Sequence, residues 1–305
     1  HEVPIISDIE LLFEVCPHAT YIAITGTNGK STTTTLIGHI LQQAKQNVQV
    51  GGNIGTAALA MEPLGEDGIY VLELSSYQLD LLQQTHFNVA VFLNLSPDHL
   101  DRHGDMEGYL EAKKKIFMNQ TPDDVAVIGV DDAYGEAVAR EKIAAAQQHV
   151  VPIMTTQQSG KGIWVKDGIL HNPLGDSELQ IDLNEMVSLR GEHNHQNAAA
   201  AYAVCHAVGV SHDAIESGMK TFPGLAHRMQ QIAQTNSIRF VNDSKATNAD
   251  AAAKSLGSYE TIFWLAGGVA KEGGIESLVP YFPRINHAYL YGEAKEAFAQ
   301  TLEES

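Results

Sequence analysis

Residues 25–32 read Thr25-Gly26-Thr27-Asn28-Gly29-Lys30-Ser31-Thr32, and they stand between an apolar run and a helical pattern. In such a loop the glycines let the backbone wrap phosphate oxygens, and the start of the helix offers unpaired N–H groups. Lys30 supplies a positive charge, and the Ser31 hydroxyl suits Mg²⁺. Ile24 stands where the usual motif has its first glycine. The alternative is a glycine-rich turn that binds nothing, but the order strand, loop, helix favours a phosphate site.

Short apolar runs recur on both sides of this loop, with helical patterns between them. The runs are Tyr21 to Thr25, Ile69 to Leu74, Ala90 to Leu95, Val125 to Val130 and Val150 to Met154. This alternation predicts a mostly parallel sheet covered by helices. Between residues 163 and 183 the pattern changes to short strands with an Asp167-Gly168 turn, which predicts a small β-ribbon. We expect helices over about residues 193–208 and 213–221.

The segment Phe222-Pro223-Gly224-Leu225 combines a helix stop with a Pro-Gly turn. We therefore expect a central P-loop ATPase domain over residues 1–224 and a second domain over residues 225–305. Strand patterns near residues 239–242, 261–266 and 288–291 suggest a Rossmann-like α/β domain. About 80 residues are few for such a domain, so we expect it to be incomplete.

Composition restricts the kind of partner. The net charge of −18 repels polyanions, so we expect no nucleic acid partner and only local phosphate sites. Two cysteines, Cys16 and Cys205, favour a reducing compartment. The sequence shows no apolar run of membrane-spanning length and no signal peptide, so a cytoplasmic protein without a membrane partner is expected.

Polar side chains follow two of the apolar runs. Glu73-Leu74-Ser75-Ser76 closes one run, and Asp98-His99-Leu100-Asp101 lies just beyond another. Ligands of open α/β sheets gather at the carboxyl ends of strands, so Glu73 and His99 could approach one metal ion. A carboxylate suits Mg²⁺, whereas imidazole is less typical. Taken alone, Glu73 fits a solvated acid and His99 a structural residue.

Lys113 lies in the middle of an apolar helix face. At about 100° per residue it shares that face with Met106, Tyr109, Leu110, Ile116 and Phe117, while Lys114 and Lys115 turn away. Burial favours the neutral amine, and a neutral amine can react with CO₂ to give a carbamate, a carboxylate-like ligand for a second Mg²⁺. By geometry alone a snorkelling lysine is the simpler interpretation.

Further polar groups follow later in the chain. These are Gly191-Glu192-His193-Asn194-His195-Gln196-Asn197, His227-Arg228, Asn242-Asp243-Ser244-Lys245-Ala246-Thr247-Asn248, and Leu265-Ala266-Gly267-Gly268 followed by Lys271. Amides with an Arg-Asp set suit adenine and ribose, although each group alone also fits a helix cap or a turn.

Taken in order, these segments resemble the Mur ligase family along essentially the whole chain. The phosphate loop matches the family's loop, including its missing first glycine. The string Asn242 to Asn248 resembles the members that add D-glutamate, rather than those that add alanine, a diamino acid or a dipeptide.

The resemblance implies a role for each matching residue. The loop Gly26, Thr27, Asn28, Gly29, Lys30, Ser31 and Thr32 would bind ATP. The ligands of two Mg²⁺ ions would be Ser31, Glu73, His99 and Lys113 as a carbamate. The nucleotide pocket would contain Asn194, Asn197, His227, Arg228 and Asp243. The muramoyl peptide would lie along Asn53, Ser75 and Ser76. D-Glutamate or the transferring phosphate would meet Lys245, Thr247 and Lys271.

The implied reaction is ATP-dependent addition of D-glutamate to UDP-N-acetylmuramoyl-L-alanine through an acyl phosphate, in peptidoglycan synthesis, by a monomer. Lys30, Lys113, His99 and Lys245 would be the catalytic residues. The family also has an N-terminal domain for the uridine diphosphate and a serine-rich loop near its C-terminus. Since neither is evident, we expect a trimmed enzyme. The alternatives are another ligase, such as a folylpolyglutamate synthetase, and a nucleotide-binding module without ligation.

Overall fold

The protein is described by a computed structural model, which covers residues 5–155, 162–173, 179–189, 191–270 and 273–304. The chain divides into two compact units, His1–Phe222 and Pro223–Ser305. The expected break after residue 224 lies two residues from this division. Among the described helices, none combines the length and apolar character that a bilayer crossing requires.

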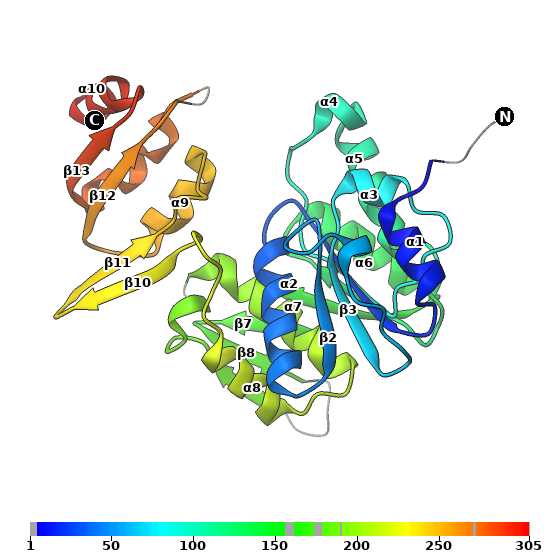
Figure 1. Ribbon diagram of the computed structural model, residues 1–305. Helices are drawn as coiled ribbons and strands as arrows, with labels where there is room; N and C mark the ends of the chain where they lie inside the picture. Colours follow the sequence, from blue (N-terminus) through cyan, green and yellow to red (C-terminus); the bar gives the residue numbers. More distant parts are fainter. Residues whose placement is uncertain (1–4, 156–161, 174–178, 190, 271–272, 305) are drawn as a thin grey trace. The chain divides into compact units, whose positions relative to one another are not determined.

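The first unit is built on one sheet, mostly parallel, with helices on both faces (Figure 1). Among the described residues its strands run in the order β2-β3-β1-β4-β5-β6-β7-β8-β9. Their bounds are β1 Thr20–Thr25, β2 Asn47–Gly52, β3 Gly68–Glu73, β4 Val89–Phe92, β5 Val125–Gly129, β6 His149–Met154, β7 Ile163–Lys166, β8 Ile169–Asn172 and β9 Leu179–Asp182.

Strands β2 to β7 pair in parallel, and β7, β8 and β9 pair antiparallel. Residues 167 and 168 have φ of 51° and 77°, the left-handed conformation that a two-residue hairpin turn requires. The predicted ribbon is therefore confirmed, as a continuation of the sheet. Strand β2 was not predicted, because its residues Asn47, Gln49 and two glycines have low strand propensity and it lies at the sheet edge.

The helices of the first unit form two covering layers. Their bounds are α1 Asp8–Val15, α2 Lys30–Gln43, η1 Ala58–Ala60, α3 Ser76–Asp80, α4 Leu100–His103, α5 Met106–Lys114, η2 Lys115–Phe117, α6 Ala133–Ala145, η3 Val187–Leu189, α7 Glu192–Ala207 and α8 His212–Thr221.

Side chains alternate along each strand, so the sheet supports two cores. Ile22 and Ile24 of β1 pack with helices α2, α7 and α8 on one face. Tyr21 and Ala23 pack on the other face with α1, α3, α5 and α6. A parallel sheet buried on both faces exposes its chemistry at the carboxyl ends of its strands, where the connections to the helices begin.

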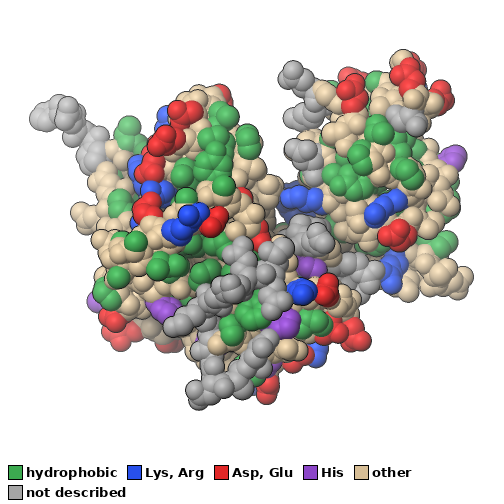
Figure 2. Space-filling model, turned by 180° about the vertical axis from the view of Figure 1, so that it is seen from behind, with side chains coloured by type: hydrophobic (Ala, Val, Ile, Leu, Met, Phe, Trp, Pro, Cys, Tyr) green, Lys and Arg blue, Asp and Glu red, His purple; other side chains and the backbone are tan. Residues whose placement is uncertain are grey.

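The second unit is smaller. It contains β10 Gln230–Thr235, β11 Ile238–Asn242, α9 Ala249–Gly257, β12 Ile262–Gly267, η4 Glu276–Arg284, β13 Ile285–Tyr291 and α10 Lys295–Glu303. Strands β10 and β11 form an antiparallel pair, and β12 and β13 a parallel pair. The core, around Leu256 and Leu278, lies on one side of β12 and β13. Figure 2 shows hydrophobic side chains at the surface of this unit, whose exposed residues include Phe263, Leu265 and Tyr289.

Candidate active site

The phosphate loop connects β1 to α2 at the carboxyl edge of the sheet, as the sequence predicts. Gly29 caps α2 with a left-handed φ of 86°, and a Cβ at this position would collide with the Asn197 side chain. Only glycine fits there, because both the backbone conformation and the space exclude a side chain. Lys30 bends back over the loop, and its Nζ donates to the carbonyl oxygens of Gly26 and Thr27 at 2.9 Å each.

Ser31 and Thr32 occupy the first turn of α2 and are half-buried. The backbone carbonyl of Ser31 accepts a hydrogen bond from Thr35 Oγ1 at 2.7 Å, as is usual inside a helix. The first-turn N–H groups of α2 have no intrahelical acceptor, so the start of the helix is suited to bind an anion.

Glu73 is the last residue of β3, and its side chain is only 3% exposed. Its Oε1 accepts a hydrogen bond from Asn53 Nδ2 at 3.0 Å. Its Oε2 is buried and accepts no hydrogen bond from the described residues. A buried carboxylate oxygen without a partner is costly, and a hard divalent cation would satisfy it. The geometry at Glu73 therefore fits a Mg²⁺ ligand.

Lys113 is buried on α5 with 1% of its surface exposed, so the predicted burial is confirmed. Its Nζ donates to Thr25 Oγ1 at 3.2 Å and to the Gly26 carbonyl oxygen at 2.9 Å. The same atom lies 4.8 Å from the centre of the Tyr109 ring.

Burial and then the nearby Lys30 charge lower the pKa of Lys113 to about 7, against the smaller opposing effects of Asp98 and Glu73. A substantial fraction of this amine is therefore neutral near neutral pH.

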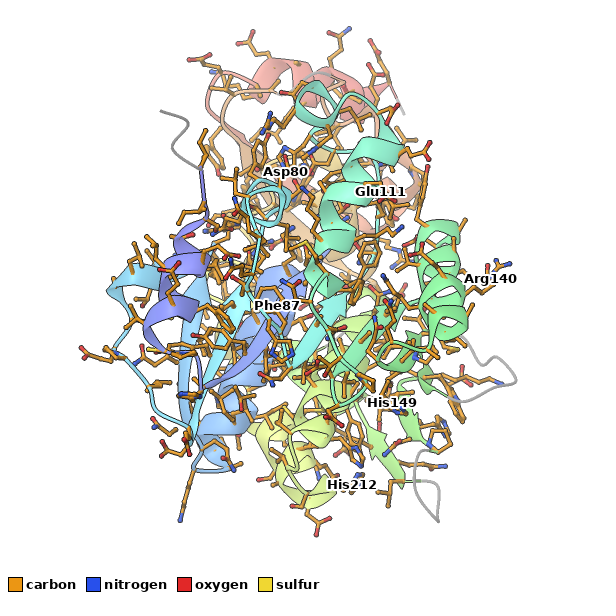
Figure 3. All side chains as sticks on the ribbon, turned by 90° about the vertical axis from the view of Figure 1, so that its right-hand side faces the viewer. Asp80, Phe87, Glu111, Arg140, His149 and His212 are labelled. Atoms are coloured by element: carbon orange, nitrogen blue, oxygen red, sulfur yellow. The ribbon has the colours of Figure 1, made fainter. Side chains whose placement is uncertain are left out.

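The neighbouring lysines turn away, as their helical positions predict. Lys114 Nζ pairs with Glu111 and Glu141 at 2.8 Å each, and Lys115 Nζ pairs with Asp80 at 2.8 Å. Asp80 ends α3 and Glu111 lies on α5, two helices that pack together above the carboxyl edge (Figure 3).

His99 precedes α4 in a left-handed conformation with φ 53°, and its ring is exposed. Its Nε2 lies 3.5 Å from Asp98 Oδ2. The ring stands 5.3 Å from Tyr77 and 6.2 Å from Tyr109 between centres. His99 and Lys113 thus both lie near the Tyr109 ring. In the part of the chain that the structure describes, no three His, Cys, Asp or Glu side chains gather to hold a metal ion.

The candidate substrate residues of the first unit also meet at this edge. The backbone N–H of Asn53 donates to the Glu73 carbonyl oxygen at 2.8 Å. Ser75 caps α3 through a capping box with Gln78. Ser76 is buried, and its Oγ lies 3.0 Å from Nε2 of His103. Burial first, and then the charges of Arg102, His99 and Lys113, lower the pKa of His103 despite Asp80, which favours a neutral ring.

Asn194 and Asn197 lie in the first turns of α7 and are buried. Asn197 Nδ2 donates to Asn194 Oδ1 at 3.1 Å, and Asn197 Oδ1 accepts from Thr33 Oγ1 at 3.1 Å. The predicted amide pair is thus joined to the helix that carries Lys30.

The second unit brings together its own candidate residues. The Lys245 N–H donates to the His227 carbonyl oxygen at 3.0 Å, and His227 Nδ1 lies 3.0 Å from Asn242 Nδ2. Asp243 Oδ1 accepts from the Met229 N–H at 2.9 Å, and its other oxygen binds the Ser255 hydroxyl.

Arg228 lies in the same loop as His227, and Thr247 follows Lys245. The side chains of Arg228, Lys245 and Thr247 are exposed. Lys271 lies outside the described residues.

Sequence reasoning assigned no functional role to three side chains of this edge: Thr25, Tyr109 and Asn94. Thr25 Oγ1 accepts from Lys113, and Tyr109 lies one helical turn before that lysine. The i,i+4 spacing of Tyr109 and Lys113 was a usable signal. Asn94 was missed because its apolar run predicts a strand to Leu95, whereas β4 ends at Phe92. The Thr27 N–H donates to the Asn94 carbonyl oxygen at 3.0 Å, since the chain leaves the strand to meet the loop.

Parallel strands whose carboxyl ends carry a glycine-rich phosphate loop are the mark of P-loop α/β proteins, and the first unit has this architecture. Residues 24–205 match the Mur ligase middle domain. The chain belongs to the Mur ligase family.

Two curated relatives show the extent of the similarity. The chain is 49% identical to a UDP-N-acetylmuramoylalanine--D-glutamate ligase of Phenylobacterium zucineum, over 98% of this chain and 65% of that protein. It is 49% identical to the enzyme of that name from Rhizobium johnstonii, over 99% of this chain and 65% of that protein. The chain thus spans about 65% of the length of these relatives.

Solved structures show the same fold. MurF from Acinetobacter baumannii superposes with a TM-score of 0.68 at 23% identity, over 97% of this chain and 66% of that protein. The UDP-N-acetylmuramate-alanine ligase MurC from Thermotoga maritima gives 0.70 at 18% identity, over 97% of this chain and 67% of that protein. The predicted fold, a P-loop α/β sheet with a ribbon and a short α/β part after it, is confirmed.

Proposed function

We propose that this chain acts in an ATP-dependent amide ligation that adds D-glutamate to UDP-N-acetylmuramoyl-L-alanine. The observation that carries the proposal is the 49% identity to two ligases named for this reaction, over at least 98% of the chain. The string Asn242 to Asn248, which resembles the D-glutamate-adding members, supports the same acceptor. A reaction that consumes ATP and yields a cell-wall precursor belongs in the cytoplasm. The enzyme would act as a monomer.

The phosphate loop would bind the triphosphate of ATP. Backbone N–H groups from Gly26 to Thr32 and the start of α2 provide donors, and Lys30 provides the charge. Lys30 Nζ now binds two loop carbonyl oxygens, so it needs only a change of rotamer to reach a phosphate oxygen.

Ser31, Glu73, His99 and Lys113 would hold two Mg²⁺ ions, and bound Mg²⁺ would neutralise charge on the phosphoryl oxygens. The unpartnered Glu73 Oε2 supports this assignment. The lowered pKa of Lys113 supports carbamate formation, in which neutral Nζ attacks CO₂, an N–C bond forms and a proton leaves. The product is an anion, so a group that would repel Mg²⁺ becomes a ligand for it.

The remaining candidates fall into three groups. Asn53, Ser75 and Ser76 would contact the muramoyl peptide. We keep Asn194, Asn197, His227, Arg228 and Asp243 as nucleotide contacts. Lys245, Thr247 and Lys271 would approach D-glutamate or the transferring phosphate.

The reaction would proceed in two displacements. The alanyl carboxylate oxygen attacks the γ-phosphorus, and ADP leaves. The amine of D-glutamate then attacks the carbonyl carbon of the acyl phosphate, and the tetrahedral intermediate releases phosphate and a proton. Two carboxylates and a triphosphate repel one another, so Lys30 and Lys245 would stabilise the charge that develops.

A panel of acceptors tests the proposal. The complete gene product that carries this sequence is given Mg-ATP and UDP-N-acetylmuramoyl-L-alanine with D-glutamate, L-glutamate, L-alanine or a diamino acid, and phosphate release is measured. We expect turnover with D-glutamate alone. Turnover with another amino acid, or with a folate in place of the muramoyl peptide, would assign the chain to a different ligase. ATP binding without turnover on any acceptor would indicate a module that does not ligate.

A further inference from the structure

Asn94 makes a two-point contact with the backbone of the phosphate loop. Its Oδ1 accepts a hydrogen bond from the Asn28 N–H at 2.9 Å, and its Nδ2 donates to the Asn28 carbonyl oxygen at 3.2 Å. Asn28 is the exposed residue at the tip of the loop, next to Gly29. The Asn94 side chain thus binds both the backbone N–H and the backbone carbonyl of Asn28, which would otherwise face water.

The Asn94 amide is itself oriented by further hydrogen bonds. Its Nδ2 also donates to Gln196 Oε1 at 2.8 Å, and Gln196 Nε2 donates to Asp131 Oδ2 at 2.9 Å. The other oxygen of Asp131 accepts from the N–H and Oγ1 of Thr155 at 2.8 and 3.1 Å. Gln196 is only 8% exposed, so water has little access to replace its partners.

These bonds have a fixed direction. A carboxylate accepts and never donates, so Asp131 turns the NH₂ group of Gln196 toward itself. Gln196 Oε1 must then face Asn94, and it selects the NH₂ group of that amide. Asn94 Oδ1 is left to face the Asn28 N–H, which is the orientation that the loop requires. The orientations of the Gln196 and Asn94 amides therefore both follow from the carboxylate of Asp131.

We propose that Asn94 is a positioning residue that holds the phosphate loop in its binding conformation before ATP arrives, and that Asp131 sets the orientation of Asn94 through Gln196. The proposal deepens the proposed function and rests on it in one respect, namely that the loop's ligand is Mg-ATP. A loop that is already ordered loses less conformational entropy on binding, so these three side chains raise the affinity without touching the nucleotide.

The packing around Gln196 supports the assignment. A Cβ on Gly129 would collide first with the Leu93 carbonyl oxygen and would also come within 2.9 Å of Gln196 Nε2, so the glycine at the end of β5 leaves room for both. One residue further along α7, Asn197 binds Thr33 of α2. Helix α7 is therefore joined both to Asn94, through Gln196, and to helix α2, through Asn197.

Reciprocal substitutions at positions 131 and 196 test the donor and acceptor directions of the hydrogen bonds from Asp131 through Gln196 to Asn94. In Asp131→Asn the Thr155 N–H binds the amide oxygen of the new asparagine, so its NH₂ group faces Gln196. The Gln196 amide must then turn to accept from that NH₂ group. After this turn, the NH₂ group of Gln196 faces the NH₂ group of Asn94, and the hydrogen bond between these two residues is lost. In Gln196→Glu, a carboxylate instead faces the carboxylate of Asp131. In the double variant, the carboxylate introduced at position 196 accepts from both sides, and the net charge equals that of the unsubstituted chain. Both single variants should therefore be impaired, and the double variant should recover.

Two measurements on the 305-residue chain separate this role from the proposed function. The first is hydrogen exchange of the Asn28 N–H without nucleotide. We expect each single variant to exchange about three- to tenfold faster, as for the loss of one ordinary hydrogen bond, and the double variant to return close to the original rate. Because no phosphate is present, added charge cannot cause the change by repelling ATP.

The second measurement is Mg-ATP affinity by calorimetry. Asp131→Asn removes a negative charge, which by charge alone would tighten ATP binding, whereas loss of the oriented amide predicts binding about three- to tenfold weaker. Gln49→Glu is the matched control, because the Gln49 amide makes the same two-point contact with the backbone of Glu62, far from the loop. The control should change neither quantity, and melting temperatures report whether each variant is folded.

The outcomes are distinct. Equal exchange rates in all variants, or a double variant no better than the worse single one, would overturn the role of Asp131 and Gln196. Faster exchange with unchanged Mg-ATP affinity would overturn the positioning role of Asn94. If the unsubstituted chain binds no Mg-ATP, the proposed function fails, while the exchange rates still decide whether the oriented chain of bonds exists.

Discussion

Lys113 Nζ donates a hydrogen bond to the carbonyl oxygen of Gly26 at 2.9 Å, which joins helix α5 directly to the first glycine of the phosphate loop. The group at this contact has a pKa lowered to about 7, so its charge changes easily. A carbamate there would carry two acceptor oxygens and a single N–H, so it could keep at most one of the two hydrogen bonds that Nζ now donates, to Thr25 Oγ1 and to the Gly26 carbonyl oxygen. The chemical state of Lys113 and the conformation of the loop are therefore coupled.

Lys113→Ala in the complete gene product should lose at least about a hundredfold in turnover, which is the usual scale for removing a group that stabilises transition-state charge. Added formate or acetate should restore part of the activity, because a free carboxylate can enter the vacated space and meet the metal. Lys114→Ala is the matched control on the same helix and should be mild, since Lys114 pairs with Glu111 and Glu141. Full activity of Lys113→Ala would remove Lys113 from the catalytic residues.

The stability of the 305-residue chain should depend on pH through Lys113. The pKa of Lys113 is about 7 in the folded chain, whereas the reference value of 10.5 applies to the unfolded chain. Between these two values the unfolded chain binds more protons, so stability rises with pH. Below about pH 7 both states are protonated and the burial cost is complete. Lys113→Met lacks this ionisation, so the melting temperature of the original chain relative to the variant should rise from pH 7 to pH 10. A difference that stays constant over this range would contradict the lowered pKa.

Lys30→Ala should abolish Mg-ATP binding and leave the fold intact, because Lys30 lies at the start of α2 and belongs to neither hydrophobic core of the first unit. Calorimetry and a melting curve measure the two properties. Lys45→Ala, just beyond the other end of the same helix, should keep ATP affinity. Unchanged affinity in Lys30→Ala would mean that the loop does not bind the phosphates.

Two buried carboxylates should differ in how much stability the same substitution costs. Glu10 accepts hydrogen bonds from the backbone N–H groups of Gln83, Gln84 and Thr85, so Glu10→Gln should destabilise the first unit by about 1–3 kcal/mol. Glu73→Gln removes a charge from an oxygen without a partner and should cost little stability. It should, however, weaken Mn²⁺ binding, measured by paramagnetic relaxation in the presence of ATP. Strong Mn²⁺ binding by Glu73→Gln would exclude Glu73 as a ligand.

From the hydrogen bonds of Glu10 we also expect the first unit to lose stability in acid. Burial raises the pKa of Glu10, but the backbone and Thr85 hydrogen bonds lower it further, so the net shift is downward. A lowered folded pKa gives stability that is present above the reference value of 4.5 and is lost as the pH falls through the folded pKa. Glu10→Gln should therefore show a weaker loss of stability in acid.

Sequence patterns predicted the sheet and the phosphate loop because both depend on local order: apolar runs, glycines and helical spacing. They also predicted the burial of Lys113, since its five neighbours on the helix face are apolar. They missed the partners of Lys113, because Thr25 and Gly26 lie 88 and 87 residues away in sequence. The hydrogen bonds from Asn28 through Asn94 to Gln196 and Asp131 were equally out of reach, since four separate segments of the chain bring them together.

The chain as written should bind Mg-ATP but ligate poorly, because binding energy from remote parts of a substrate positions the reacting carboxylate, and the chain spans only 65% of its relatives. The most direct test of ligation uses the complete gene product that carries this sequence. It is supplied with ATP, D-glutamate and UDP-N-acetylmuramoyl-L-alanine labelled with oxygen-18 in the alanyl carboxylate. An acyl phosphate intermediate predicts one labelled oxygen in each phosphate released, because the oxygen that attacks phosphorus leaves with it. Unlabelled phosphate, formed at the same rate with or without D-glutamate, would contradict the proposed ligation.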